Sequence, residues 1–160
     1  MADLNETPNS PNIEPTPSED MDHEDVNEIL NDIRIKNINN IIIAYLNINS
    51  FPNKYDALNF FIPENIDIMI IGETKLDDSY PTTQFLIDGF SKPFRRDRDK
   101  FGGGTLCYVR KGLLCMELTK HTFPDDIEGL IIEINLRKSK WLLLSTYHPQ
   151  AKMTPIISIL

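Results

Sequence analysis

The sequence predicts an α/β sandwich, in which helices and β-sheets form stacked layers. Two apolar segments, at residues 41–48 and 67–72, flank a segment with helical spacing, which indicates a β-α-β unit. Several β-rich segments follow between residues 84 and 147, separated by Gly, Pro, Asp or Lys, and these indicate antiparallel strands. The chain has 160 residues, which is enough for one domain with a buried core.

The N-terminus is acidic. Residues 1–28 contain nine of the 24 acidic residues and neither Lys nor Arg, which leaves 15 acidic against 16 basic residues in positions 29–160. The net charge of −8 therefore belongs to the N-terminus and does not exclude a nucleic acid as the partner of the rest. Because residues 1–21 are rich in polar residues and Pro, we expect a disordered tail whose protein partners are unknown. The next apolar residues recur at helical spacing and predict an amphipathic helix over residues 22–34: Val26, Ile29, Leu30 and Ile33.

A β-α-β unit opens the remaining segment, residues 35–160. Residues 41–48 form a β-branched run without polar alternation, which predicts a central strand that is covered on both faces. The helical spacing that follows begins with Asn53, interpreted as a capping-box residue, and stops at Pro63. Residues 67–72 predict a second buried strand, parallel to the first through a right-handed crossover.

The second half of the chain predicts strands at residues 84–90, 104–110, 113–119, 129–136 and 140–147. Cys107 and Cys115 lie among apolar residues without a CxxC spacing, so we expect two reduced, buried thiols and an intracellular protein. Trp141 is predicted to pack in the core. The longest apolar run is far shorter than the roughly 18 to 20 residues that cross a bilayer, so we expect no membrane partner.

Polar residues follow both strands of the β-α-β unit. Asn47 and Asn49 end the first strand, and Glu73 comes just after the second. Because the carboxyl ends of neighbouring parallel strands meet at one edge, an amide and a carboxylate are predicted side by side there. Mg²⁺ takes oxygen ligands, commonly one or two carboxylates, so this edge suits it. The same residues also fit a structural interpretation, in which the asparagines turn the chain and Glu73 is a solvated strand end.

A basic loop and a glycine run follow. The cations of the loop are Arg95, Arg96, Arg98 and Lys100. Such a loop suits contact with phosphate, but the interleaved Asp97 and Asp99 fit a solvated, salt-bridged loop equally well. Residues 102–104 are three glycines without a following Gly-Lys-Ser/Thr, so we interpret them as a turn that leads into the strand at 104–110 rather than as a phosphate cradle.

Ten segments carry a family resemblance. In chain order they are residues 46–50 (LNINS), 53–56 (NKYD), 70–77 (IIGETKLD), 84–90 (QFLIDGF), 93–98 (PFRRDR), 102–104 (GGG), 108–110 (YVR), 133–136 (EINL), 140–142 (KWL) and 147–149 (YHP). With these segments, residues 35–150 resemble the endonuclease domain of non-LTR (LINE-type) retrotransposon polyproteins, within the endonuclease/exonuclease/phosphatase superfamily. The resemblance implies a four-layered α/β sandwich, a DNA substrate and a nuclear location, although no targeting signal is visible.

The resemblance also implies roles for single residues. Asn47 matches the asparagine that lines the phosphate and metal site, and Glu73 matches the carboxylate that binds Mg²⁺, or Mn²⁺ in its place. Tyr147 matches the active-site tyrosine, whose hydroxyl would donate to a phosphate oxygen. Asn49 is expected beside them. These implied roles favour the chemical interpretation of the strand ends over the structural one.

In the intact family the basic loop would lie near the DNA, so Arg95 and Arg98 are expected to bind phosphate. The chain departs from the family in two ways. Gln150 stands where several relatives carry Asn, and the family's Asp-x-Asn, further Asp and late Asp-His motifs do not occur after Pro149. We therefore expect residues 35–160 to be the N-terminal portion of such a domain, inactive alone because general-base catalysis of roughly 10² to 10⁴-fold is lost. The alternative is a non-catalytic remnant or protein-interaction module.

Overall fold

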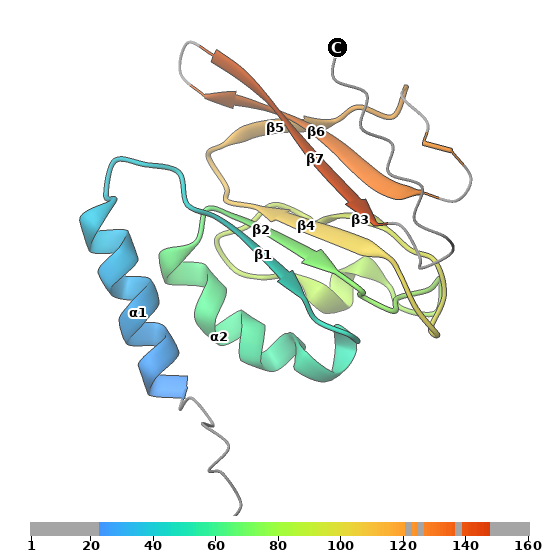
Figure 1. Cartoon of the computed structure of the whole chain (residues 1–160), viewed down its shortest axis with the longest axis horizontal. Helices are drawn as coiled ribbons and strands as arrows, with labels where there is room; N and C mark the ends of the chain where they lie inside the picture. The colour runs from blue at the N-terminus through green and yellow to red at the C-terminus, as the bar shows by residue number, and fades with distance from the viewer. Residues whose placement is uncertain (1–22, 121–122, 125–126, 137–138, 148–160) are drawn as a thin grey trace, which may run out of the picture.

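The structure is a computed structural model that describes residues 23–120, 123–124, 127–136 and 139–147. Its helices are α1 (His23–Lys36) and α2 (Tyr55–Asn65), with 3-10 helices η1 (Pro52–Lys54) and η2 (Thr82–Phe85). Its strands are β1 (Ile43–Asn47), β2 (Ile68–Gly72), β3 (Phe94–Arg96), β4 (Thr105–Val109), β5 (Leu114–Glu117), β6 (Glu128–Leu136) and β7 (Ser139–Tyr147). The strands form two sheets that face each other (Figure 1). The mixed α/β class is confirmed.

The first sheet has the strand order β1-β2-β4-β3. β1 and β2 are parallel, as predicted, and Asn47 pairs with Gly72 at their carboxyl ends. α2 lies between these strands in the chain and covers the face of the sheet that points away from the second sheet (Figure 1). All five residues of β2 are buried, because neighbouring strands flank it and both faces of the sheet are covered. β2 is therefore the central strand that positions the residues after it.

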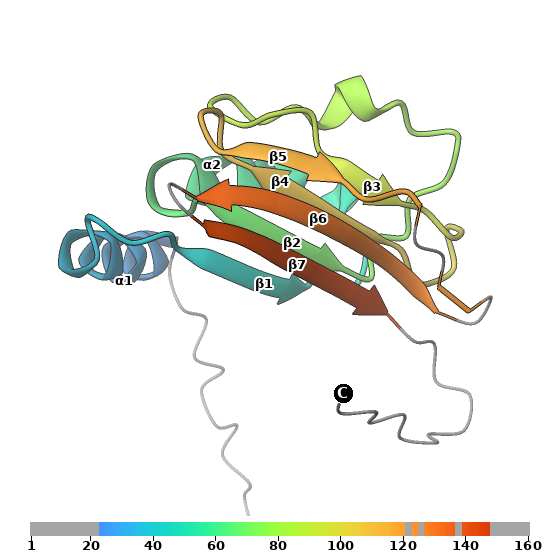
Figure 2. The same ribbon diagram turned by 90° about the horizontal axis from the view of Figure 1, so that it is seen from above.

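The second sheet is an antiparallel meander, β5-β6-β7, and it lies across the first sheet (Figure 2). Cys107 and Val109 of β4 share a buried apolar cluster with Leu130 and Ile132 of β6, so the two sheets have a common core. Buried strand side chains of this kind supply most of the driving force for packing. The register of the meander pairs Glu128 with Tyr147, which brings both residues to the same end of the sheet.

An aromatic cluster on the other face of the first sheet fixes the loop after β1. Phe51 is fully buried and packs edge to face on Phe85, with ring centroids 5.1 Å apart. Tyr108 of β4 contacts the same cluster and donates its hydroxyl proton to the Phe85 carbonyl at 2.8 Å. Burial raises the pKa of Tyr108, so this phenol is a structural donor and not an acid.

β1 lies at the edge of its sheet, so the prediction of a central strand at residues 41–48 was wrong. Tyr45 is 63% exposed, and Ile43 and Leu46 are also exposed. The Tyr45 hydroxyl lies over Gly72, where an added Cβ would be 2.8 Å away from it. An unbroken apolar run does not distinguish an edge strand from a central one. The apolar side chains show which residues could be buried on the two faces of the strand, but not how many strands pair with it.

Several local predictions were also wrong. Residues 84–90 form η2 and a loop with one isolated bridge at Phe90, not a strand. Asn53 does not cap α2 but donates to the Ser50 hydroxyl at 3.2 Å, and Pro63 lies inside the last turns of α2. Trp141 is 55% exposed on β7 and does not pack in the core. Both cysteines are free, but only Cys107 is fully buried, and Cys115 is half-buried.

The outer face of the β5-β6-β7 sheet is apolar and has no described helix over it. Its exposed side chains are Leu114, Met116, Leu142 and Leu144, with Leu142 at 67% exposure. The described residues therefore form three layers, one helical and two of strands, and the fourth layer that the family resemblance implies is not among them. The disordered tail predicted at residues 1–21 lies outside the described residues, whereas the helix expected at 22–34 is present as α1. No described helix is long and apolar enough to cross a membrane.

Lysine substitutions on β7 distinguish its two faces. Replacing Leu142 and Leu144 by Lys is expected to change the free energy of unfolding by less than about 1 kcal/mol, because both side chains point outward. The intervening Leu143 packs against the core between the sheets, so Leu143→Lys is expected to cost roughly 2 to 3 kcal/mol. Urea denaturation measures both changes. If the substitutions of Leu142 and Leu144 lowered the free energy of unfolding more than Leu143→Lys does, this assignment of the two faces of β7 would be wrong.

Candidate functional site

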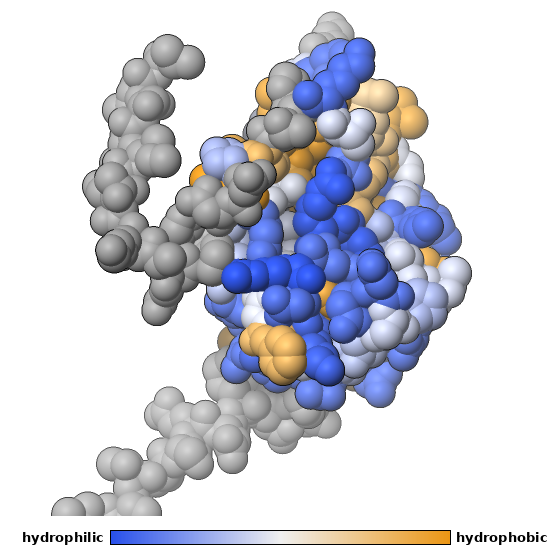
Figure 3. Space-filling model, turned by 90° about the vertical axis from the view of Figure 1, so that its right-hand side faces the viewer, coloured by the Kyte–Doolittle hydropathy of each residue, from blue (hydrophilic) through white to orange (hydrophobic). Residues whose placement is uncertain are grey.

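The carboxyl ends of β1 and β2 meet at one edge of the first sheet, as predicted. Asn47 is the last residue of β1 and pairs with Gly72, the last residue of β2, and Glu73 follows directly. Asn49 lies two residues beyond Asn47, in the loop that Phe51 anchors. This edge faces the viewer in Figure 3, where the described surface is largely hydrophilic. An amide and a carboxylate therefore lie on neighbouring strand ends.

The loops at this edge have an unusual backbone. Four residues other than glycine have positive φ: Asn49 (47°), Ser50 (97°), Glu73 (57°) and Lys75 (54°). Each such residue costs roughly 1 to 3 kcal/mol relative to an ordinary conformation and persists only where the surroundings fix it. Strained residues of this kind gather at binding and catalytic sites more often than elsewhere.

Backbone hydrogen bonds hold these loops to one another. The Ser50 N–H donates to the Glu73 carbonyl at 2.9 Å. The Lys75 N–H donates to the Gly103 carbonyl at 3.0 Å, and the Thr74 N–H donates to the Gly104 carbonyl at 3.3 Å. The loop after β2 is thus held between the loop after β1 and the glycines before β4. The backbone that carries the Glu73 side chain is therefore fixed in place.

The strain at Ser50 gives a direct test. Ser50→Gly is expected to raise the free energy of unfolding by about 0.5 to 1 kcal/mol, because glycine adopts a φ of +97° without steric cost. The loss of the exposed Asn53 hydrogen bond offsets little of this gain. Ser91→Gly, at a position with ordinary φ, is the matched control and is expected to destabilise. Equal changes in the free energy of unfolding for Ser50→Gly and Ser91→Gly, measured by thermal or urea unfolding, would show that the Ser50 backbone is not strained.

The Glu73 carboxylate accepts one backbone donor and lies beside a phenol. Its Oε2 atom accepts the Gly103 N–H at 3.1 Å. The Tyr147 hydroxyl lies beside the same carboxylate, and its interaction with Glu73, followed by burial and the nearby charges of Glu73 and Glu128, raises the pKa of Tyr147 to about 12. Tyr147 therefore remains a proton donor across the neutral range. The structure thus brings Glu73 and Tyr147 together and places Asn47 at the same edge.

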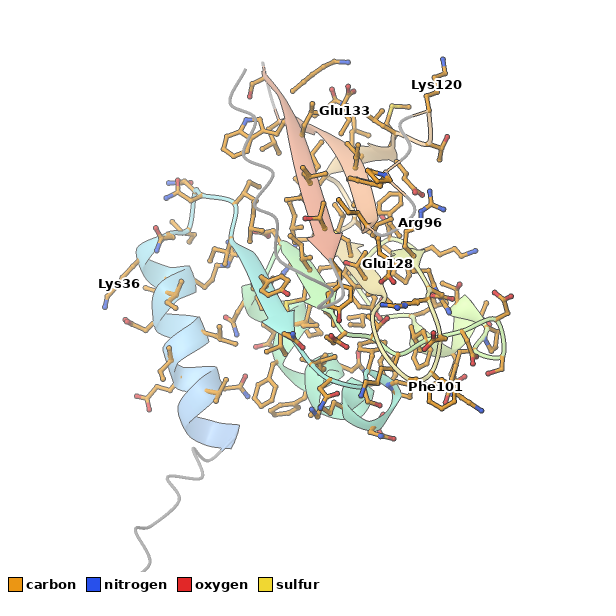
Figure 4. All side chains as sticks on the ribbon, turned by 45° about the vertical axis from the view of Figure 1, so that its right-hand side comes forward. Lys36, Arg96, Phe101, Lys120, Glu128 and Glu133 are labelled. Carbon is orange, nitrogen blue, oxygen red and sulfur yellow. The ribbon has the colours of Figure 1, made fainter. Side chains whose placement is uncertain are left out.

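Glu128 is a further residue of this site that the sequence did not reveal. Its Oε2 atom accepts the Gly104 N–H at 2.6 Å, and its Oε1 atom lies 3.3 Å from Arg98 Nε. It pairs with Tyr147 in the register of β6 and β7. Figure 4 shows Glu128 at the end of β6 nearest the loop that carries Phe101. A single Glu before an apolar strand has no distinctive spacing, so no sequence signal pointed to it.

The two arginines predicted to bind phosphate differ in their surroundings. The Arg95 guanidinium is bonded to Asp97 and donates to the Tyr80 carbonyl at 2.9 Å and the Asp77 carbonyl at 3.2 Å. These bonds fit the salt-bridged interpretation of the loop. Arg98 is more exposed and lies at the site through its ion pair with Glu128. Phosphate binding by Arg95 and Arg98 stays a prediction, and the geometry favours Arg98.

The three glycines form a turn before β4, as predicted, and they also contact the site. Gly103 and Gly104 have φ values of 76° and 82°, whereas Gly102 does not adopt positive φ. A Cβ at Gly103 would lie 2.7 Å from both Arg98 Cδ and Glu128 Oε2. A Cβ at Gly104 would collide with the Thr74 hydroxyl. Glycine is therefore required at these two positions, because the surrounding side chains close in on the backbone.

The donor set fits a hard cation. Glu73 carries a carboxylate, and Asn47 carries an amide on the adjacent strand end. Mg²⁺ commonly keeps several waters and binds only one or two protein carboxylates. Among the described residues, no group of three or more His, Cys, Asp or Glu side chains gathers as a metal site.

An apolar groove of the described part of the chain lies away from this edge, at residues 41–43 before and within β1, the end of β6 and the start of β7. It is lined by apolar and amide side chains, including Ile33, Ile43, Leu136 and Trp141, and none of its lining residues is titratable. Such a surface offers no acid, base or charged ligand. The strand-end edge with Glu73, Tyr147 and Glu128 is therefore the candidate functional site.

Comparison with known proteins does not assign the chain to a family: no protein-family model matches it, and no curated protein matches it.

Proposed function

We propose that the candidate site binds Mg²⁺ or Mn²⁺ and a DNA phosphodiester, as part of a metal-dependent endonuclease of the endonuclease/exonuclease/phosphatase type. The observation that carries this proposal is the Glu73 carboxylate, which the Gly103 N–H holds at the shared end of β1 and β2, beside the Tyr147 hydroxyl. The proposed fold is the corresponding four-layered sandwich, of which the chain supplies the N-terminal portion. The resemblance to retrotransposon endonucleases supports the choice of DNA.

Each residue has a role that its surroundings support. Glu73 would hold the cation, with Asn47 orienting a ligand beside it, and a bound Mg²⁺ would neutralise charge on the phosphate. The Tyr147 hydroxyl carries a single proton, so on substrate binding it would leave Glu73 and donate to a phosphate oxygen instead. Arg98 would add positive charge at the rim. The Asp-x-Asn and Asp-His motifs that the family uses for the attacking water do not occur after Pro149, so we propose binding without turnover by this chain alone.

Binding of Mn²⁺ tests the metal site, because electron paramagnetic resonance distinguishes the bound ion from the free ion. We expect saturable binding that weakens at least about tenfold in Glu73→Ala, since this removes the carboxylate that anchors the ion. Glu64→Ala, an exposed glutamate in α2, is the control and is expected to bind as the unaltered chain does. Equal affinity of the Glu73 and Glu64 variants would refute the proposed metal site.

Nicking of supercoiled DNA tests turnover in the presence of Mg²⁺. We expect no nicking by this chain alone, and we expect any trace of activity to disappear in Glu73→Ala. Nicking that persists in this variant would place the chemistry elsewhere. DNA binding without nicking, weakened by Arg98→Ala, would fit the proposal, because a phosphate contact contributes affinity without contributing a catalytic base.

A protein-interaction module is the second candidate. The outer face of the β5-β6-β7 sheet favours it, because Leu114, Met116, Leu142 and Leu144 expose apolar side chains around the Glu133–Lys140 ion pair. In this case, Glu73→Ala would leave binding of the partner protein unchanged. The double substitution Leu142→Lys and Leu144→Lys would abolish this binding. Pull-down assays with both variants separate the two candidates.

A further inference from the structure

We propose that Glu128 is a positioning residue: its carboxylate fixes the glycine loop and Arg98, and the loop in turn orients the Glu73 carboxylate. The glycine loop is defined here as Gly102, Gly103 and Gly104. This inference deepens the proposed function and rests on it. It states that Glu128, at the start of β6, orients the Glu73 carboxylate of the first sheet. Glu128 itself does not need to contact the metal ion or the DNA.

Adjacent N–H groups of the loop serve the two carboxylates. The Gly103 N–H donates to Glu73 at 3.1 Å, and the Gly104 N–H donates to Glu128 at 2.6 Å. Hydrogen bonds to an ionised carboxylate are stronger than neutral ones, so each anchors one of two adjacent peptide planes. These planes meet at the Gly103 Cα, which the Arg98 and Glu128 side chains crowd, so release of Gly104 from Glu128 frees the Gly103 backbone to rotate and weakens its hold on Glu73.

Glu128 joins the two sheets at the site. The glycine loop belongs to the first sheet, through β4, whereas Glu128 begins β6 of the second sheet. Its strand partner is Tyr147, which contacts Glu73. Nearby, the Thr105 and Ser145 hydroxyls form a buried hydrogen bond of 2.8 Å between the same two sheets. The Glu128 contacts therefore help to fix the separation of the two sheets at the site, and with it the distance between Tyr147 and Glu73.

Glu128 also orients Arg98. The ion pair uses Arg98 Nε, 3.3 Å from Glu128 and 3.9 Å from Asp99. Within the described part of the chain, the terminal nitrogens of Arg98 have no hydrogen-bond partner, and the side chain remains 39% exposed. A guanidinium held through Nε presents its two terminal amino groups outward, in the arrangement that pairs with a phosphate. Glu128 thereby prepares Arg98 for an anionic ligand.

Close packing leaves the loop little freedom to compensate for a change at Glu128. An added Cβ at Gly103 would lie 2.7 Å from Glu128 Oε2 and 2.7 Å from Arg98 Cδ. At Gly102 the nearest atom would be Glu73 Oε2, at 4.0 Å. Gly103→Ala therefore displaces Glu128 and Arg98 without removing either side chain, and Gly102→Ala is its matched control.

Amide hydrogen exchange followed by NMR tests the positioning without a metal ion. In Glu128→Ala we expect the Gly103 and Gly104 N–H groups to exchange at least about tenfold faster, because the acceptor of Gly104 is lost and the Gly103 backbone is free to rotate. In Glu128→Gln we expect the Gly104 N–H to stay protected, since the side-chain amide oxygen still accepts it, whereas Arg98 loses its ionic partner and its Nε chemical shift changes. Gly103→Ala is expected to resemble Glu128→Ala, and Gly102→Ala the unaltered chain.

Binding of Mn²⁺ adds the functional readout. We expect Glu128→Ala to weaken Mn²⁺ binding by roughly 3- to 30-fold and Glu128→Gln to restore most of this loss, as for a residue that orients a metal ligand through a hydrogen bond. Unchanged exchange of the Gly103 N–H in Glu128→Ala, or an unchanged Arg98 Nε chemical shift in Glu128→Gln, would overturn the positioning role. Absence of Mn²⁺ binding by the unaltered chain would instead overturn the proposed function, because the exchange measurements do not depend on the ion.

Discussion

Gly104→Ala is expected to lower the free energy of unfolding by about 3 kcal/mol or more. A φ of 82° is unfavourable for alanine by roughly 1 to 2 kcal/mol. The new Cβ would also collide with the buried Thr74 hydroxyl and lie 3.3 Å from the Arg96 carbonyl. The second contact is with backbone, which cannot move without disturbing the pairing of β3 with β4. Urea denaturation of the Gly104→Ala variant and of the unaltered protein measures the loss of unfolding free energy.

A double-mutant cycle identifies the source of this loss. Thr74→Ala removes the hydroxyl that the new Cβ would meet, and this hydroxyl has no hydrogen-bond partner among the described residues. Gly104→Ala is therefore expected to cost about 1 to 2 kcal/mol less in the Thr74→Ala background. Gly102→Ala is the control and should cost under about 1 kcal/mol, since its position is open. Strict additivity of the Thr74 and Gly104 changes would show that the two groups do not meet.

The sequence predicted the strand-end edge because parallel pairing follows from chain order. An apolar strand, a helix and a second apolar strand leave few alternatives to a parallel unit, and the residues after both strands then share one edge. Asn47 and Glu73 were found in this way. The contact of Tyr147 with Glu73 did not follow from pattern alone, because it depends on how the second sheet lies across the first.

Glu128 and Arg95 show what pattern reasoning does not reach. Glu128 acts through one backbone N–H of a loop 24 residues away in the chain, so no spacing rule relates the two. Arg95 carries the charge expected of a phosphate ligand, yet the Asp77 and Tyr80 carbonyls accept its N–H groups. Partners of this kind are set by loop conformation, and an edge strand such as β1 is likewise defined only by which strands pair with it.

Asp67 ties together four parts of the chain at the end of the strands remote from the site. Its carboxylate accepts the Arg34 side chain of α1 at 2.7 Å, the Ile42 N–H at 2.8 Å and the Arg110 Nε–H at 2.9 Å. Arg34 also donates to the Asn65 carbonyl at 2.8 Å, next to the end of α2. α1 is therefore fastened to the domain through an ion pair and a side-chain hydrogen bond. The arrangement is shielded, since Asp67 is only 8% exposed.

These bonds lower the pKa of Asp67. Burial alone would raise it, but the hydrogen bonds from Ile42, Arg34 and Arg110 and the charge of Arg34 outweigh burial. An acid whose pKa is lower in the folded than in the unfolded chain stabilises the fold when it is ionised. This stabilisation is fully present above the unfolded value of about 4 and is lost as the pH falls through the lowered folded value.

Asp67→Asn is therefore expected to lower the free energy of unfolding at pH 7 by about 2 kcal/mol, because Arg34 and Arg110 lose their common counter-ion while partly shielded from water. The difference from the unaltered chain should shrink as the pH falls below about 4, because Asp67 then takes up a proton in the unfolded chain before it does so in the folded chain. Asp88→Asn is the control: Asp88 is fully exposed and lies 3.8 Å from Lys111, so its loss should cost under about 0.5 kcal/mol. Urea denaturation between pH 3 and pH 7 measures these differences. A gap between Asp67→Asn and the unaltered chain that stays constant down to pH 3 would show that ionisation of Asp67 does not hold α1 to the domain.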